Sequence, residues 1–154
     1  MKIAANKRSG ANKNLLVAAA AILIVVGYFG FKWMRGLMRL GYEDSVIRRM
    51  RLLYLAETQF AKEHPTLGYT CALAQLPAGE ELQRLVANHG IENGYALEIA
   101  GCKTPDSERP NPTYSINARP LHSGQPAFCS DQSGVIRADY GGSVERCRVN
   151  GVAL

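Results

Sequence analysis

The longest apolar run of the chain covers residues 15–31 and contains no charged side chain. Basic residues lie on both sides of it, and Lys32 ends it. About 17 residues is at the short end of the length that crosses a bilayer as a helix, and a helix satisfies its own backbone hydrogen bonds in hydrocarbon. Tyr28 and Trp33 fit the aromatic belt of a membrane interface. The pattern therefore predicts a transmembrane helix over residues 15–34, in preference to a buried core helix.

A removable signal peptide would combine the same basic and apolar segments, but it would end in a cleavage site between small residues. The run instead leads into the stretch GYFGFKW at residues 27–33, so we expect an uncleaved anchor. Basic residues are almost balanced on its two sides. The basic tail of residues 1–14 contains no acidic residue, which disfavours its translocation and indicates a cytoplasmic N-terminus.

A second helical pattern, an amphipathic one, follows over residues 35–64. Apolar residues recur there at spacings of three and four, which places them on one helix face; they are Val46, Met50, Leu53, Ala56 and Phe60. We expect Val46, Met50, Leu53 and Phe60 to pack on a sheet. Leu52 and Leu55 would widen this apolar face, while Glu57 is assigned to another side of the helix.

The ends of this amphipathic helix are defined unequally. Proline disfavours helical geometry in the residue before it, so the pair His64-Pro65 predicts a stop. At the other end, the glycines within residues 36–41 and the polar pair Asp44-Ser45 leave two alternatives open. Either the helix breaks there and a new one is capped, or one helix continues from the apolar run to His64.

The remainder of the chain, residues 65–154, predicts a small sheet domain. A short helix is expected over residues 80–88, with Gly90 as its stop. Apolar and polar residues then alternate over residues 95–100 and 114–118, which is typical of strands. Residues 127–129 and 135–137 should form a hairpin through the turn-rich segment between them. The predicted fold class is α+β, with a long N-terminal helix packed on a small antiparallel β-sheet.

Charge is spread unevenly along the chain. The 154 residues carry a formal net charge of +5, which divides into +7 for residues 1–64 and −2 for residues 65–154. Cations beside an apolar span suit anionic lipid headgroups. These cations therefore indicate a membrane partner. The sheet domain is mildly acidic, so we expect no nucleic-acid partner.

All four cysteines lie in the sheet domain, at Cys71, Cys102, Cys129 and Cys147. They form no C-x-x-C pair and no histidine is near them in sequence, which argues against zinc. An even number of cysteines in a small exported domain favours disulfides, and hence a periplasmic or extracellular location for a single-pass inner-membrane protein. Three pairings are possible; Cys71–Cys102 with Cys129–Cys147 closes the two shortest sequential loops. Four free thiols on the cytoplasmic side are the alternative.

Catalytic chemistry has little support in the sequence. The three histidines, His64, His89 and His122, are scattered over helix ends and a loop. Ser133 lies in a turn-like segment that lacks the pattern of a nucleophile elbow. We therefore expect no enzyme activity, no catalytic, metal-binding or cofactor-binding residues, and no cofactor.

The layout and several segments resemble type IV pilins and the pseudopilins of type II secretion. The resemblance covers roughly residues 48–139, and its segments are LAETQFA at 55–61, PTLGYTC at 65–71, GYALEIAGC at 94–102, TYSI at 113–116 and AFCSDQSGVIR at 127–137. It implies a three- or four-stranded sheet on a long helix, and a structural or assembly role in a pilus or secretion system. It also implies protein partners or self-association through the N-terminal helix.

The N-terminal end departs from this resemblance. Prepilins are cut before a phenylalanine, and a glutamate follows in the apolar segment. Here Gly10 is followed by ANKNL, with neither residue. The departure favours an alternative function, a permanently tethered binding domain that does not polymerise and that uses the loop of residues 103–125.

Overall fold

The computed structural model describes residues 9–70, 72–77, 79–102 and 110–154. Two compact units make up the chain, Met1–Gly41 and Tyr42–Leu154. Helices and strands follow one another in the order α1 (Ser9–Glu63), the short 3-10 helix η1 (Leu73–Gln75), α2 (Glu80–Ala87), β1 (Ile91–Glu92), β2 (Tyr95–Ala100), β3 (Ser115–Pro120), β4 (Ala127–Asp131), β5 (Arg137–Asp139), α3 (Val144–Asn150) and β6 (Val152–Ala153). The α+β class predicted from the sequence is confirmed.

Helix α1 is longer than its apolar run. It begins at Ser9, so the end of the predicted basic tail is helical, while residues 1–8 lie outside the described part. Helical structure continues through residues 36–41, because isolated glycines destabilise a helix interior by only about 1 kcal/mol each. Ser45 does not cap a new helix; its hydroxyl donates to the Tyr42 carbonyl oxygen at 2.9 Å. The helix ends at Glu63, where His64-Pro65 predicts a stop.

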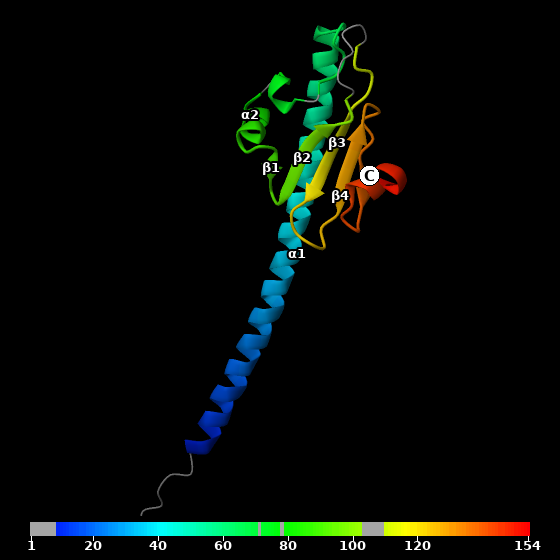
Figure 1. The fold of residues 1–154 in the computed structure, drawn as a ribbon. Helices are drawn as coiled ribbons and strands as arrows, with labels where there is room; N and C mark the ends of the chain where they lie inside the picture. The colour runs from blue at the N-terminus through cyan, green and yellow to red at the C-terminus, as the bar shows by residue number, and fades with distance from the viewer. Residues whose placement is uncertain (1–8, 71, 78, 103–109) are drawn as a thin grey trace, which may run out of the picture. The chain divides into compact units, whose positions relative to one another are not determined.

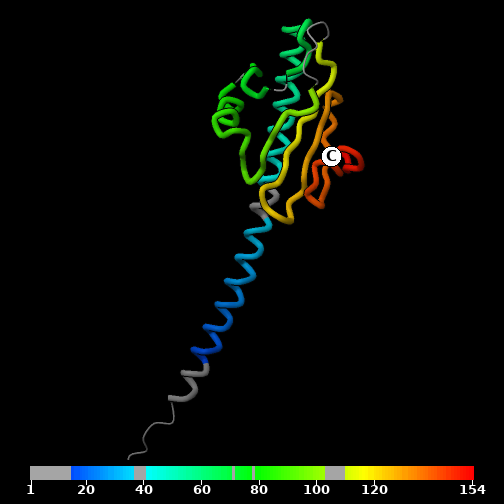
Figure 2. Tube along the Cα trace, viewed as in Figure 1, coloured from blue at the N-terminus to red at the C-terminus, as the bar shows by residue number. Residues whose placement is uncertain are grey.

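The six strands form one antiparallel sheet in which each strand pairs with its sequence neighbour, in the order β1-β2-β3-β4-β5-β6 (Figures 1 and 2). The resemblance implies three or four strands, and the two extra strands are the outermost. Each consists of two residues. A strand of two residues is too short to show an alternating pattern, so neither of these strands could be predicted from periodicity.

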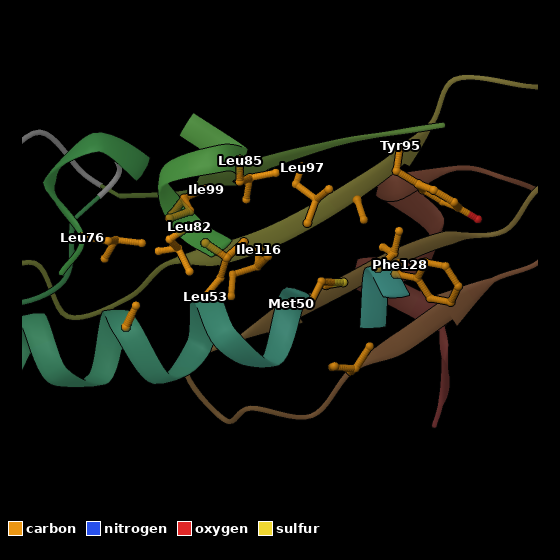
Figure 3. Close-up of a cluster of buried hydrophobic side chains, with 14 of the residues drawn as sticks. Met50, Leu53, Leu76, Leu82, Leu85, Tyr95, Leu97, Ile99, Ile116 and Phe128 are labelled. Carbon is orange, nitrogen blue, oxygen red and sulfur yellow. The ribbon is translucent and has the colours of Figure 1, made fainter. Parts of the chain in front are cut away.

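One face of the sheet is apolar and packs on the part of α1 within the second unit. The register pairs Leu97 with Ala118 and Ala118 with Phe128, so these side chains share a face. Figure 3 shows Met50 and Leu53 of α1 directed toward this face. Leu76, Leu82 and Leu85 extend the core beyond the sheet.

Helix α2 ends close to its predicted stop, and both His89 and Gly90 adopt the left-handed conformation there. His89 has a φ of 52°, and the N–H groups of His89 and Gly90 donate to Val86 and Leu85 at 3.0 and 2.9 Å. This is the hydrogen-bond pattern of a Schellman motif. Glycine is required at position 90 because φ is +79° and because a Cβ there would overlap the Leu97 carbonyl oxygen.

The hairpin predicted between residues 127 and 137 is present. Strands β4 and β5 pair, and the turn between them is closed by Asp131, whose carboxylate accepts from the Ser133 N–H at 2.8 Å. Val135 and Ile136 precede β5 instead of belonging to it. Gly134 has a φ of +74°, and a Cβ there would press on the ring of Tyr54, so the turn fits closely against α1.

Candidate functional site

The apolar segment of α1 has no cover within its own unit. Every large apolar side chain described between Leu15 and Met34 is more than half exposed, from 54% for Val25 to 76% for Trp33. Soluble monomers rarely expose a contiguous apolar surface of this size to water. Among the described residues, α1 is the one helix long and apolar enough to cross a membrane, judged by length and composition.

The second half of α1 has the opposite character, because one of its faces is buried under the sheet. Val46, Met50 and Leu53 are at most 1% exposed, and Phe60 is 7% exposed. Leu52 is half-buried, in line with the predicted apolar face. Leu55 is 60% exposed, so the prediction that it belongs to this face is wrong. The buried positions follow the 3.6-residue period of the helix, and Leu55 lies outside the face that they form.

Glu57 lies on this buried face, which corrects its assignment to another side of the helix. The interval of four from Leu53 and of three to Phe60 places it there. Its side chain is fully buried; Oε2 accepts from the Thr70 N–H at 3.0 Å, and Oε1 has no hydrogen-bond partner among the described residues. Burial raises the pKa of Glu57 to about 7, and the Thr70 hydrogen bond offsets part of that rise.

Tyr114 lies near Glu57. The rings of Tyr69 and Tyr114 pack in a tilted arrangement with centroids 4.7 Å apart. Burial, and then the neighbouring Glu57 carboxylate, raises the pKa of Tyr114, whose buried hydroxyl also has no hydrogen-bond partner in the part of the chain that the structure describes. The segment carrying Thr70 is held on its other side by Asn111, whose carbonyl oxygen accepts from the Tyr69 N–H at 3.1 Å. A titrating carboxylate therefore contacts the first segment after α1.

Arg49 connects three elements of the second unit and was not singled out by the sequence pattern. Its guanidinium donates to both carboxylate oxygens of Glu92, each at 2.7 Å, and to Glu81 at 2.9 Å. The side chain is 14% exposed. These hydrogen bonds raise the pKa of Arg49 and fix α2 and β1 against α1.

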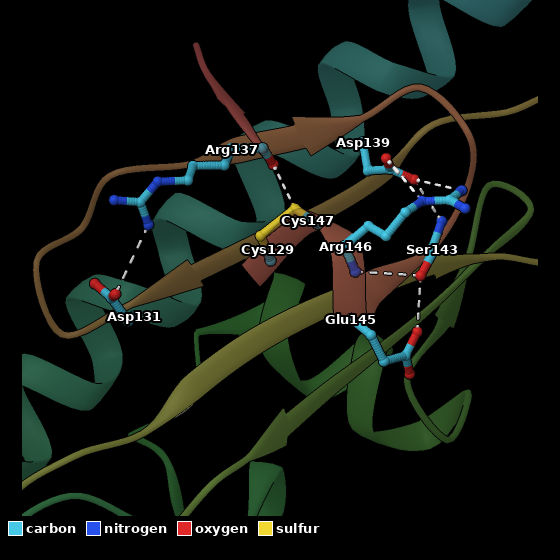
Figure 4. Close-up of a disulfide and its surroundings, with 8 residues drawn as sticks. All are labelled: Cys129, Asp131, Arg137, Asp139, Ser143, Glu145, Arg146 and Cys147. Carbon is cyan, nitrogen blue, oxygen red and sulfur yellow. Dashed lines mark hydrogen bonds and ion pairs between the residues drawn. A yellow bond between two sulfur atoms is a disulfide. The ribbon is translucent and has the colours of Figure 1, made fainter. Parts of the chain in front are cut away.

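Cysteine pairing is confirmed where the structure describes both partners. Cys129 of β4 and Cys147 of α3 form a disulfide, and both are almost fully buried (Figure 4). The other predicted pair contains Cys71, which lies outside the described residues; Cys102 is disulfide-bonded.

Helix α3, which carries Cys147, is not predicted by the sequence pattern. Ser143 caps it by accepting from the Arg146 N–H at 3.2 Å, and Arg146 pairs with Asp139 at 3.2 Å (Figure 4). Seven residues form a weak helix on their own. The disulfide and the Asp139 contacts stabilise it, and neither is visible in the local sequence pattern.

A small polar pocket of about 270 Å³ lies on the outer face of the sheet, beside the disulfide. Its charged lining comes from Asp131, Arg137 and Arg148, and Asp131 and Arg137 approach to 3.8 Å. The predicted binding loop of residues 103–125 is not one loop, because residues 115–120 form the central strand β3. Residues 103–109 lie outside the described part.

The residues considered for catalysis are not assembled into a site. The ring of His64 packs at a tilt against Phe60 at the end of α1, with ring centroids 4.4 Å apart, and His122 is exposed in the β3–β4 connection. Ser133 is exposed, and its hydroxyl accepts from Val135 N–H at 3.3 Å. Within the described ranges, Ser133 has no hydrogen bond to a histidine. In the same part of the chain, no group of three His, Cys, Asp or Glu side chains could hold a metal ion.

Comparison with known proteins adds no relative to this description. No protein family, no curated protein and no solved structure matches the chain.

Proposed function

We propose that this protein is a membrane-anchored, pilin-like structural or assembly protein of a type IV pilus or type II secretion type system, without catalytic activity. The exposed apolar segment of α1 carries the proposal. This segment requires lipid or other apolar helices around it, whereas the apolar face in the second half of α1 is covered by the sheet of the same chain. This division of one helix between two apolar environments suits an anchored subunit.

The same segment offers room for close helix contacts. A Cβ built on Gly27 or Gly30 would meet no atom within 4 Å, and four alanines occupy positions 18–21. Small residues let neighbouring helices approach closely in a membrane. Self-association through this segment is therefore part of the proposal.

The disulfide supports an exported domain. Structural disulfides persist in oxidising compartments, and the Cys129–Cys147 bond joins a helix and a strand that are otherwise short. With the N-terminus in the cytoplasm, a single crossing places Tyr42–Leu154 in the periplasm or outside the cell. A protease added to intact spheroplasts should then remove that domain, and its protection would contradict this topology.

A permanently tethered domain that does not polymerise is the second candidate. The residues after Gly10 lack the phenylalanine and glutamate of a prepilin, and the polar pocket beside Arg137 gives the outer face a possible binding site. This candidate shares the anchor and the topology with the first. It differs in making no contact between copies.

Two measurements on the protein from its own cells distinguish these functions. The first is the intact mass after membrane extraction: loss of residues 1–10 would favour a filament subunit, and a full-length chain would favour the tethered domain. The second uses a photo-reactive side chain in place of Ile24, which is 72% exposed, and Tyr140, which is 69% exposed, as the matched control. Crosslinks between copies from position 24 but not from 140 support assembly; their absence at both positions contradicts it.

A further inference from the structure

Two cations and two aromatic rings share one face of α1 at the end of the apolar run. Tyr28, Phe31, Lys32 and Arg35 are spaced at i, i+3, i+4 and i+7, which places them on one side of the helix. All four are exposed within the first unit. The pattern is local to one helix, so it does not depend on any other part of the chain.

Each cation lies over the ring four residues before it. The Lys32 ammonium is 5.5 Å from the centroid of Tyr28, and the Arg35 guanidinium is 4.3 Å from that of Phe31. Both charges are thus drawn back toward the apolar run, to the level of its last turn. Cation–π contacts of this kind strengthen when water is removed.

An apolar groove lies next to the Lys32 side of this face. Its lining consists of Val25, Val26, Phe29, Gly30, Lys32 and Trp33. A Cβ on Gly30 would meet nothing within 4 Å, so the groove is open at that point. A cation beside an open apolar groove matches an anion that carries a hydrocarbon chain, and a free phosphate would leave the groove empty.

Within the described residues, these two cations have no counter-ion. Residues 15–36 contain no acidic side chain, and in the described part neither Lys32 nor Arg35 forms an ion pair. We propose that Lys32 and Arg35, positioned by the rings of Tyr28 and Phe31, bind the headgroup phosphate of an anionic phospholipid whose acyl chain occupies the groove beside Gly30. The inference rests on the proposed membrane anchoring and adds a lipid class to it.

The single tryptophan of the chain provides the test. Trp33 lies between the two cations along the helix and is 76% exposed. The full-length protein is reconstituted into vesicles of phosphatidylglycerol and phosphatidylcholine with identical acyl chains, one of the two lipids being brominated in each series. Quenching of Trp33 across mixing ratios gives the relative affinity of the two lipids at this position. Two cations at about 1 kcal/mol each at a lipid surface correspond to an expected preference of about thirtyfold for phosphatidylglycerol.

Three variants separate the proposed site from general charge. Lys32→Gln with Arg35→Gln should reduce the preference to nearly onefold. Arg48→Gln with Arg51→Gln removes the same charge from exposed positions further along α1 and should leave it unchanged. Tyr28→Leu with Phe31→Leu keeps the cations without the rings, and it should reduce the preference by about half.

Failure of this inference differs from failure of the anchor. Equal quenching by both brominated lipids in the wild-type protein, or an unchanged preference in the Lys32/Arg35 variant, overturns the lipid site and leaves the anchor intact. No quenching of Trp33 by either brominated lipid overturns the membrane anchoring as well.

Discussion

Replacing Glu57 by glutamine should remove most of the pH dependence of stability above pH 5. The amide keeps an oxygen that can accept the Thr70 N–H, and it cannot ionise. In the wild-type protein the buried carboxyl has a pKa of about 7, raised by burial from its ordinary value of 4.5. The folded protein therefore holds a proton that the unfolded chain releases at lower pH.

The size of the effect follows from this difference in pKa. The stabilising contribution is fully present below pH 4.5 and is lost as the pH rises through about 7. A difference of about 2.5 pKa units, at 1.36 kcal/mol per unit, corresponds to about 3 kcal/mol between pH 4.5 and pH 8. Asp131, Asp139 and Glu145 have lowered pKa values, so their contributions change at more acidic pH.

Urea unfolding of the full chain in a non-ionic detergent measures this, with the near-ultraviolet circular dichroism of the tyrosines as the signal. The wild-type unfolding free energy should fall by about 3 kcal/mol from pH 4.5 to pH 8. The Glu57→Gln variant should show a nearly flat profile in that range. Glu63→Gln, the same charge change at an exposed position near the end of α1, should follow the wild type. Equal slopes in the wild type and the Glu57→Gln variant would refute the assignment of this titration to Glu57.

The remaining predictions concern the packing of α1 and the disulfide, each measured by urea unfolding at pH 7. Met50→Ala should lower the unfolding free energy by about 2–5 kcal/mol because it leaves a core cavity, whereas exposed Leu55→Ala should change it little. Comparable losses would show that Met50 is not in the core. Arg49→Met should lower the unfolding free energy by about 1–3 kcal/mol because it leaves Glu92 unpaired. Arg84→Met removes an exposed ion pair and should lower the unfolding free energy by less than about 1 kcal/mol. Equal effects of the two substitutions would exclude Arg49 as a structural link. Replacing both Cys129 and Cys147 by serine opens a loop with a sequence separation of 18 residues and should lower the unfolding free energy by about 3 kcal/mol. Unchanged stability of the wild-type protein after reduction would contradict this contribution.

Long periodic segments were predictable from the sequence because burial follows their period. The face of α1 from Val46 to Phe60 and the alternation in β2 repeat often enough to be recognised without tertiary information. Glu57 also had a signal, since it occupies a position of the same period. Its charge led to its assignment to a solvated face, although a hydrogen bond and a raised pKa allow it to be buried.

Other features depend on contacts between distant segments and left no local signal. Arg49 meets Glu92 across 43 positions, and nothing in either neighbourhood marks the pair. Helix α3 requires the bond to Cys129 and the contacts to Asp139. Helix α1 continues through residues 36–41 because glycine lowers helix stability without forbidding the conformation.

Because each strand of the sheet pairs with its sequence neighbour, the domain can form progressively as the chain is synthesised. From β2 onward, each strand pairs with the strand that precedes it in the chain, so its partner is already present when the strand is synthesised. Such local pairing keeps loop-closure entropy small and favours fast folding. Helix α1 emerges first and offers its apolar face as a surface on which the strands are added in turn. The Cys129–Cys147 bond joins β4 to α3 on either side of β5, so its formation is a chemical marker that this C-terminal part of the domain has come together.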